Sequence, residues 1–386
     1  MSAPLCVVAG AGRLAAGYVA PLLAETGWQV VLVSRSREVV DAVQRGAGLT
    51  VAVVGPRDMR RWIGGVQAMN RLDPRLPGLV AGADLVATSV GPGALCDVGT
   101  WLGPLLRRRL DTKAAPLNVV TFENHRRAPE LLAEGLLAAA PSLAGELGRR
   151  LGLAGSAVWS VVSRREVEPG GLTLYTDGVT EAYVDRRGVL DGVAPLDGSV
   201  PGLRPVEPFD AWMAEKLWLF NGGHAAAAYL GFLAGCATVD EALARPRLRA
   251  EVRAVLAEAA AALGGHSGSP SDARLDAILT RYADPALADP VTRVAREPRR
   301  KLAPGDRLIG PAVAARGVGV QPAALARVAA AALAYREPSD PQAVALDAEL
   351  RLLGPAEVLA TISQLHPSDE LSRLVCASYH DLVRGA

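Results

Sequence analysis

The chain opens with a short strand, a glycine turn and a helix, in the stretch PLCVVAGAGRLAAGYVAPLLAETG. Leu5–Ala9 is an apolar run of the kind that forms a buried strand. The turn after it has the spacing GxGxxA, at Gly10, Gly12 and Ala15. The first glycine permits a tight turn, the second lets a pyrophosphate approach the backbone, and the small third residue lets helix and strand pack closely. The helix N-terminus adds free N–H groups for an anion. We interpret the stretch as a dinucleotide site, with a plain glycine turn as the alternative.

The residues after the second strand indicate which dinucleotide binds. This strand is expected over Gln29–Val33, and Ser34 and Arg35 follow it. NAD-binding folds usually carry an acidic residue at this place, which bonds the ribose 2′-hydroxyl. A carboxylate would repel a 2′-phosphate, whereas a serine and an arginine bind one through charge-assisted hydrogen bonds. We predict NADP(H), with NAD(H) as the alternative if Arg35 and Arg37 are only solvated loop charges.

Two more predicted strands end where a cofactor crosses the carboxyl edge of a parallel sheet. The first, ADLVATSVGP, stops at a Gly-Pro pair, so Val90 and Gly91 are expected beside the cofactor. The second, PLNVVTFEN, ends at Glu123 and Asn124. Asn124 is placed for chemistry at that edge, unless it only caps the next helix.

The chain of 386 residues is long enough for two domains, and its pattern changes along its length. The segment GLTLYTDGVTEAYVD alternates enough to form strands that extend the first sheet. A Pro/Gly-rich stretch at 191–208 marks a boundary. We predict an α/β fold, with a Rossmann dinucleotide-binding domain and extra strands over 1–195 and a mostly α-helical substrate domain over 205–386. Helical spacing of apolar residues is clear in 241–263, 322–336 and 355–382.

The helical half begins with KLWLFNGGH, an oily stretch that carries three polar side chains. On an α-helix at about 100° per residue, Lys216, Asn221 and His224 fall at about 0°, 140° and 80° and share one face. The apolar neighbours would keep that face dry. The alternative is a helix whose lysine extends past its apolar neighbours to reach solvent and whose histidine lies in the core with its hydrogen bonds satisfied.

The chemistry of these side chains suits an acid/base site. Burial lowers the pKa of a lysine, which makes Lys216 a candidate general acid/base near neutral pH. Asn221 can donate to a carbonyl or alkoxide oxygen, and His224 can orient a substrate hydroxyl or hold the lysine. Gly222 and Gly223 are expected to leave room for a ligand against the backbone.

Composition excludes several other classes of function. The net charge of +1 provides no broad attraction for nucleic acid or anionic lipid. The N-terminus lacks the basic start of a secretory signal, and no apolar run is long enough for a membrane span, so a cytoplasmic protein is expected. Neither a metal site nor a disulfide framework is expected, because the cysteines are far apart in sequence, at Cys6, Cys96, Cys236 and Cys376.

Taken together, these motifs resemble mannitol-1-phosphate 5-dehydrogenase in the polyol-specific long-chain dehydrogenase group. The Lys-x4-Asn-x2-His pattern typical of the group is complete at Lys216, Asn221 and His224. The resemblance implies that the lysine is the general acid/base of a metal-independent reaction, that Asn221 and Asn124 cradle the oxyanion, and that the histidine contacts the reacting hydroxyl or the lysine. The matching stretches are 10–27, 83–92, 116–124, 215–235, 293–311 and 334–343.

The resemblance also implies a substrate. The implied reaction is hydride transfer between a nicotinamide and a secondary carbinol. Fructose 6-phosphate and mannitol 1-phosphate are the default substrate pair. Arg300, Lys301 and Arg307 form a local cationic cluster that is implied to lie near the sugar phosphate, and guanidinium geometry suits phosphate. The alternative is a surface patch in which Asp306 pairs with Arg307.

Three positions depart from the family pattern. Ser34 replaces the usual cofactor-selecting aspartate, and Arg13 stands in the glycine turn, where it could add a phosphate contact. Trp159 and Ser160 stand where the family commonly has an Asp-Arg pair beside the substrate, which implies an altered substrate. We therefore keep two alternatives: a divergent enzyme for another sugar, cyclitol or modified sugar phosphate in specialised metabolism, and an NADP-binding sensor without turnover. The expected partner is a small sugar or sugar phosphate, and the oligomeric state stays open.

Overall fold

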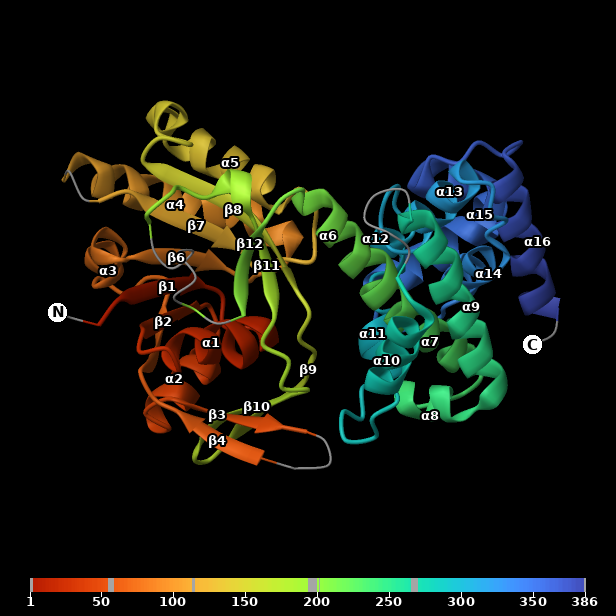
Figure 1. Ribbon diagram of the computed structural model, residues 1–386, viewed down its shortest axis with the longest axis horizontal. Coiled ribbons are helices and arrows are strands. Elements are labelled where there is room, and N and C mark those ends of the chain that lie inside the picture. The colour runs from red at the N-terminus through yellow and green to blue at the C-terminus, as the bar shows by residue number, and fades with distance from the viewer. Residues whose placement is uncertain are drawn as a thin grey trace. The chain divides into compact units, whose positions relative to one another are not determined.

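The computed structural model describes residues 3–54, 59–112, 115–193, 200, 202–264 and 270–384. The chain forms two compact units, Met1–Met213 and Ala214–Ala386 (Figure 1). The first is an α/β unit and the second is helical, which confirms the predicted fold class. The division falls after the Pro/Gly-rich stretch, because Leu203–Val206 forms strand β12 of the first unit's sheet.

The first unit is built on an eight-stranded sheet in the order β12-β11-β8-β7-β6-β1-β2-β5. The six strands from β8 to β5 are parallel, in the order of a doubly wound dinucleotide-binding fold. Strand β11 (Ala182–Asp185) runs antiparallel to β8 and joins β12 to the sheet. The parallel strands are β1 (Leu5–Ala9), β2 (Gln29–Ser34), β5 (Val66–Asn70), β6 (Leu85–Thr88), β7 (Leu117–Thr121) and β8 (Leu151–Val158).

Helices cover both faces of this sheet (Figure 1). Side chains alternate along β1, so Val8 belongs to the same buried cluster as Leu23 and Val43, while Val7 belongs to the other cluster with Leu102. The first face is covered by the π-helix η1 (Ala15–Val19), α1 (Ala20–Ala24) and α2 (Arg37–Arg45). The second is covered by α3 (Leu76–Gly82), α4 (Leu95–Asp111) and α5 (Ala128–Ala139), and short 3₁₀ turns lie at Pro92–Ala94, Pro141–Gly145 and Arg186–Gly188.

A second, four-stranded sheet in the first unit has the order β4-β3-β10-β9. Its strands are β3 (Leu49–Val53), β4 (Met59–Ile63), β9 (Val162–Glu168) and β10 (Gly171–Thr176). The expectation that GLTLYTDGVTEAYVD extends the main sheet is right for β11 and wrong for β10. Strand β10 pairs in parallel with β3 instead, more than 100 residues earlier, and local alternation carries no information about so distant a partner.

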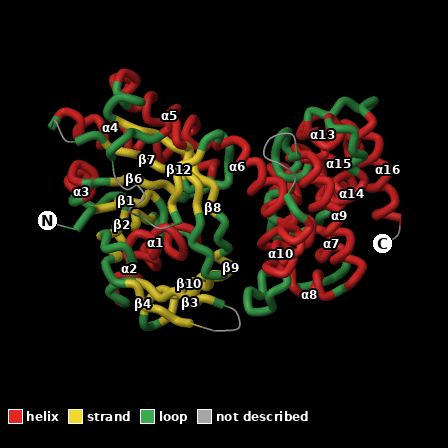
Figure 2. Tube along the Cα trace, viewed as in Figure 1, coloured by secondary structure: helices red, strands yellow, loops and turns green. Residues whose placement is uncertain are grey.

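The second unit is a helical bundle around α7 (Gly222–Leu233), of which Ala225 to Leu230 are buried (Figure 2). Helix α6 (Phe209–Glu215) and the π-helix η5 (Lys216–Asn221) lead into it. None of the helices in the described ranges is both long and apolar enough to cross a membrane. The other helices are α8 (Val239–Ala244), α9 (Pro246–Leu263), α10 (Asp272–Tyr282), α11 (Val291–Ala295), α12 (Pro298–Lys301), α13 (Ile309–Gly317), α14 (Ala323–Leu333), α15 (Pro341–Ser363) and α16 (Glu370–Arg384).

Two of the predicted helical stretches are interrupted. The stretch 241–263 divides between α8 and α9, because Arg245 is extended ahead of Pro246. The stretch 355–382 divides between α15 and α16, because Gln364 takes a left-handed conformation that ends α15.

Candidate active site

The glycine turn between β1 and η1 has the geometry of a phosphate cradle. Gly10 has a φ of 120°, and a Cβ at this position would collide with the carbonyl oxygen of Ser89, so only glycine fits. A Cβ at Gly12 would meet only that same oxygen, at 3.9 Å, so the backbone there is open to a ligand. Ala15 is fully buried against the sheet, and Arg13 is half-buried at the start of the helix. The residues present therefore fit the pyrophosphate of a dinucleotide.

A buried carboxylate shapes the loop opposite this turn. Glu123, after β7, accepts hydrogen bonds from the backbone N–H groups of Val90 at 2.8 Å and Gly91 at 2.9 Å, and from Thr88 Oγ1 at 3.4 Å. Burial raises the pKa of Glu123 to about 7, although these hydrogen bonds oppose the rise. Gly91 has a φ of 90° with open space at its Cβ position. The sequence places Glu123 at this edge, but nothing in it shows the clamp on Val90 and Gly91.

The predicted 2′-phosphate site lies at the carboxyl end of β2. Ser34 Oγ accepts a hydrogen bond from the Ser36 N–H at 3.0 Å, and Ser36 caps α2. Ser34 is buried, whereas Arg35 and Arg37 are exposed. The Ser34 hydroxyl keeps its hydrogen for a ligand, since its contact with Ser36 uses the oxygen as acceptor.

Lys216, Asn221 and His224 lie on a helix that is not α-helical throughout. Residues Lys216–Asn221 form the π-helix η5, so the predicted angles of about 0°, 140° and 80° are wrong for this segment. A π-helix bonds residues five apart, so Asn221 lies one π-turn from Lys216. His224 follows three residues later in α7, at the next position on the same face. The π-turn therefore aligns the three side chains more closely than an α-helix would.

The environment of Lys216 suits proton transfer. The side chain is buried, and this burial lowers its pKa to about 7, with further lowering by the positive charges of Arg307 and Arg300. Asn221 Nδ2 is buried and has no hydrogen-bond partner among the described residues. A buried donor of this kind is available to a ligand oxygen.

The two glycines of this segment do not serve the purpose expected of them. A Cβ at Gly222 would lie 2.9 Å from the Arg307 carbonyl oxygen, and one at Gly223 would lie 2.6 Å from Leu256 Cδ2. The expectation that they leave room for a ligand is therefore wrong. They leave room for neighbouring protein segments, one of which carries Arg307.

His224 has protein partners that its sequence neighbours do not reveal. Its Nε2 lies 3.2 Å from Asp289 Oδ2, and Asp289 also accepts hydrogen bonds from Arg293. The His224 ring stacks on Tyr282 at a centroid distance of 4.7 Å and an angle of 6°. The Tyr282 hydroxyl donates to the carbonyl oxygen of Phe220. The DxxxR spacing indicates that Asp289 and Arg293 pair with each other, but it does not indicate the contact of Asp289 with His224.

The three predicted phosphate ligands lie in the same unit, largely shielded from solvent. Arg300 Nε donates to Glu297 at 2.7 Å, and Lys301 Nζ donates to the Arg296 carbonyl oxygen. Arg307 Nε donates to Asp306 at 2.8 Å, as the surface-patch alternative requires. Arg307 is nevertheless buried, and its Nη2 has no partner among the described residues. Burial first, and then the charges of Arg307 and Arg300, lower the pKa of Lys301.

Comparison with known protein families shows the class of this protein. A family model described as the mannitol dehydrogenase Rossmann domain matches residues 6–217, and one described as the mannitol dehydrogenase C-terminal domain matches residues 208–373. The chain belongs to the mannitol dehydrogenase family. It is accordingly an oxidoreductase of the polyol dehydrogenase type, which uses a nicotinamide cofactor and acts on a CH–OH group, and the sensor alternative falls away.

Solved structures share the fold of this mannitol dehydrogenase family member. Mannitol 2-dehydrogenase from Pseudomonas fluorescens, in a ternary complex with NAD and D-mannitol, matches with a TM-score of 0.80 and 16% identity, over 99% of this chain and 92% of that one. A substrate-free D-sorbitol dehydrogenase matches with a TM-score of 0.76 and 17% identity, over 99% and 94%. D-mandelate dehydrogenase with NADH and anilino(oxo)acetate is more distant, with a TM-score of 0.54 and 12% identity, over 89% and 99%.

Three residues with predicted roles in this family member lie at sheet ends of the first unit. Asn124 is exposed and directly follows Glu123. Trp159 is buried directly after β8, where its backbone N–H donates to the Glu181 carbonyl oxygen at 3.1 Å. Ser160 Oγ lies 3.2 Å from Thr176 Oγ1 and donates to Asp177 at 3.3 Å. The Ser160 hydroxyl is thus engaged by protein groups.

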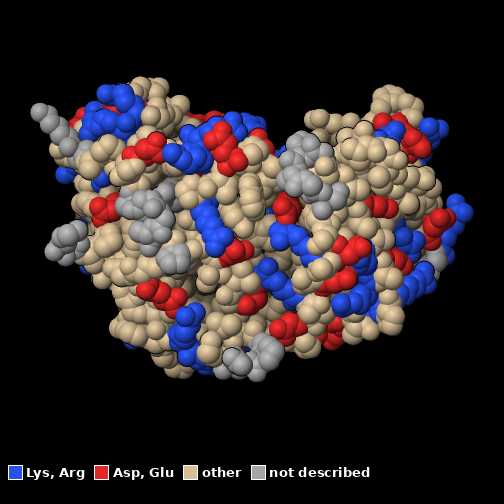
Figure 3. All heavy atoms as spheres, in the orientation of Figure 1, with Lys and Arg blue, Asp and Glu red and all other residues tan. Residues whose placement is uncertain are grey.

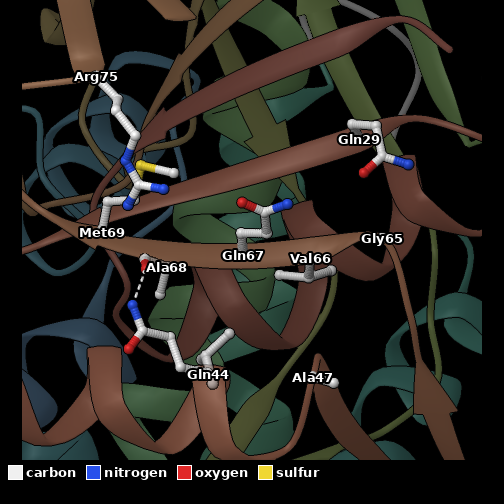
Figure 4. Close-up of a pocket in the computed structure, with 10 residues that line it drawn as sticks. Gln29, Gln44, Ala47, Gly65, Val66, Gln67, Ala68, Met69 and Arg75 are labelled. Atoms are coloured by element: carbon white, nitrogen blue, oxygen red, sulfur yellow. Dashed lines mark hydrogen bonds between the residues drawn. The ribbon is translucent and has the colours of Figure 1, made fainter.

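Other features of the molecule do not add to this site. No group of His, Cys, Asp or Glu side chains in the described part of the chain could hold a metal ion. Figure 3 shows positive and negative side chains interspersed on the face in view. A cavity of about 470 Å³ lies along edge strand β5, between Gln44, Gln67 and Arg75, and no predicted site residue lines it (Figure 4).

Proposed function

We propose that this mannitol dehydrogenase family member interconverts a keto-sugar phosphate and a polyol phosphate, with NADP(H) as the preferred cofactor. Fructose 6-phosphate and mannitol 1-phosphate are the default pair. The observation that carries the proposal is Lys216, a buried lysine with a pKa of about 7 that lies close enough to Arg307 and Arg300 to be affected by their charges. An acid/base near neutrality beside fixed positive charge suits a reaction on a carbinol of an anionic substrate.

The residues would divide the work in the reducing direction. The nicotinamide supplies the hydride when it is bound. Lys216 gives a proton to the carbonyl oxygen, and Asn221 Nδ2, which has no partner among the described residues, donates to the same oxygen as charge develops on it. Asn124 is proposed as a second donor. Removing one such donor typically costs about 2.7–4 kcal/mol of transition-state stabilisation.

The phosphate would be bound by the cationic cluster. Arg307 keeps one buried Nη2 with no partner in the described residues, and Arg300 shares the Glu297 carboxylate with Arg296. A phosphate oxygen at Nη2 would give that nitrogen a charge-assisted hydrogen bond. Lys301 Nζ already donates to the Arg296 carbonyl oxygen, and burial lowers its pKa, so we assign the phosphate contacts to Arg307 and Arg300.

The experiment is NADPH and NADH oxidation, followed by absorbance, with fructose 6-phosphate, fructose and a panel of other ketoses. Turnover of fructose 6-phosphate over fructose is expected. Arg307→Gln should raise the KM for the phosphorylated ketose roughly 10- to 100-fold, since a charged hydrogen bond contributes about 1.5–3 kcal/mol, and leave that for fructose unchanged. An equal increase in KM for both ketoses would contradict the assignment of Arg307 to the substrate phosphate.

A second candidate is favoured by Trp159 and Ser160. A buried indole and an engaged hydroxyl replace the charged pair implied by the resemblance, so the reaction is the same but the substrate is another sugar, cyclitol or modified sugar phosphate. Replacing both residues by Asp and Arg should then lower activity on the true substrate. An unchanged or improved rate would count against this candidate.

A further inference from the structure

The ring of His224 is fixed in position by groups on two sides. Tyr282 stacks against it nearly parallel, at 4.7 Å and 6°, and is itself held by the hydrogen bond to the Phe220 carbonyl oxygen. Asp289 Oδ2 lies 3.2 Å from Nε2. The stacking sets the plane of the ring, and the carboxylate sets its rotation within that plane. The other nitrogen, Nδ1, therefore faces away from Asp289.

The carboxylate that holds His224 is itself rigid and ionised. Its side chain is 3% exposed, and its backbone carbonyl accepts a hydrogen bond from the Val239 N–H at 3.0 Å. Burial alone would raise the pKa of Asp289, but the hydrogen bonds and charges of His224 and Arg293 outweigh it and lower the pKa. An ionised carboxylate only accepts hydrogen bonds, so the hydrogen in this contact must be on His224 Nε2. In neutral imidazole, that leaves the lone pair on Nδ1.

We propose that Asp289 is a positioning residue that holds His224 in the Nε2–H form, so that Nδ1 accepts a hydrogen bond from a substrate hydroxyl next to the reacting carbon. The inference rests on the proposed function of the Lys216 site. It requires that the substrate carry a hydroxyl beside the reacting carbon. A 2-keto acid is rejected, because its carboxylate has only acceptor atoms and would face a second acceptor.

The first test is the tautomer of His224 in the full-length protein, read by nitrogen NMR after labelling with ¹⁵N-histidine. The chain has five histidines, and the His224 signals are those lost in His224→Gln. At alkaline pH, where histidine is neutral, the Nε2–H form is expected. The Nδ1–H form in the wild-type protein overturns the proposal. This measurement needs no substrate, so its failure is distinct from failure of the proposed function.

The variant Asp289→Asn should move this proton. An asparagine has one acceptor oxygen, and the arginine at 293 can only donate, so the oxygen turns to Arg293 and the NH₂ group turns to His224. The imidazole then accepts at Nε2 and carries its hydrogen on Nδ1. The double variant Asp289→Asn/Arg293→Met frees the oxygen and should restore the Nε2–H form. An unchanged tautomer in Asp289→Asn counts against the positioning role.

Kinetics give a second readout. Asp289→Asn should lower kcat/KM for fructose 6-phosphate at least 10-fold, and much less for the deoxy analogue that lacks the hydroxyl bound by Nδ1. Glu251→Gln is the matched control, since Glu251 also lies between two arginines, Arg247 and Arg327, and should leave both substrates unaffected. An equal loss on both substrates in Asp289→Asn would indicate a purely structural carboxylate and overturn the proposal.

Discussion

The carboxylate of Glu123 accepts a hydrogen bond from the backbone N–H of Gly91 at 2.9 Å, and its other oxygen accepts one from Val90. A glutamine at 123 has a single acceptor oxygen, so one of the two N–H groups would face an NH₂ group. A buried donor without a partner costs about 1–3 kcal/mol. Glu123→Gln should therefore loosen the loop and weaken NADPH binding roughly 10-fold, measured by fluorescence titration.

The control for Glu123→Gln is Glu258→Gln. Glu258 also accepts from two backbone N–H groups, those of Ala324 and Leu325, but it does so in the second unit. This variant should reduce the melting temperature without changing cofactor affinity. Equal losses of affinity in both variants would mean that Glu123 acts only through stability.

Cofactor choice can be tested at the end of β2. Ser34→Asp places a carboxylate where a 2′-phosphate is expected, and Arg35→Ala removes the exposed guanidinium beside it. Each should lower the ratio of kcat/KM for NADPH over NADH about 10- to 100-fold, the range of one charged hydrogen bond. Arg37→Ala is the matched control, because Arg37 is 92% exposed and lies 3.8 Å from Asp41. A ratio unchanged by Ser34→Asp and Arg35→Ala would contradict the assignment of NADP(H).

Much of the first unit follows from sequence because its signals are local. Local sequence is enough to predict the strands at Leu5–Ala9 and Gln29–Ser34 and the glycine turn after the first of them, because the residues that form each signal are close together in the chain. The small sheet could not be predicted in this way, because β10 finds its partner β3 more than 100 residues away. The end of α15 at Gln364 likewise depends on a left-handed conformation that no glycine announces.

At the candidate site, sequence spacing identifies side chains but not what surrounds them. Lys216, Asn221 and His224 can be picked out from their spacing, yet the π-turn that aligns them cannot, because its residues have no distinctive composition. The role of Gly222 depends on the backbone of Arg307, which lies 85 residues further on. The contact of Asp289 with His224 also joins residues far apart in the sequence, so local spacing does not indicate it.

Stability offers a test of the burial of Lys216. Its pKa is about 7 when folded against an ordinary 10.5, so folding between these values must release a proton. The free-energy cost of burying Lys216 in the folded state is largest below pH 7 and disappears as the pH rises toward 10.5. Lys216→Met should abolish turnover, leave NADPH binding intact and increase the free energy of unfolding at pH 7 by roughly 2–4 kcal/mol. The gain should vanish near pH 10.5, and a gain independent of pH would contradict the low pKa.

The pH dependence of the reaction tests the connection between Lys216 and the phosphate. The profile of kcat/KM reports the free enzyme, where Lys216 has a pKa of about 7, set by burial and then by Arg307 and Arg300. Ketone reduction needs the protonated lysine, so its rate should fall as the pH rises through this value, and polyol oxidation should rise. A bound phosphate dianion offsets the two guanidinium charges and favours the charged lysine.

The pKa in the kcat profile, which reports the complex, should therefore be higher than that in kcat/KM for fructose 6-phosphate and nearly equal to it for fructose. Arg307→Gln provides the control within the same site, since removing one repulsive charge should raise the pKa seen in kcat/KM for both ketoses. If fructose and fructose 6-phosphate raised the pKa in the kcat profile equally, the substrate would act on Lys216 by excluding water and not through its charge. The phosphate would then have to bind elsewhere.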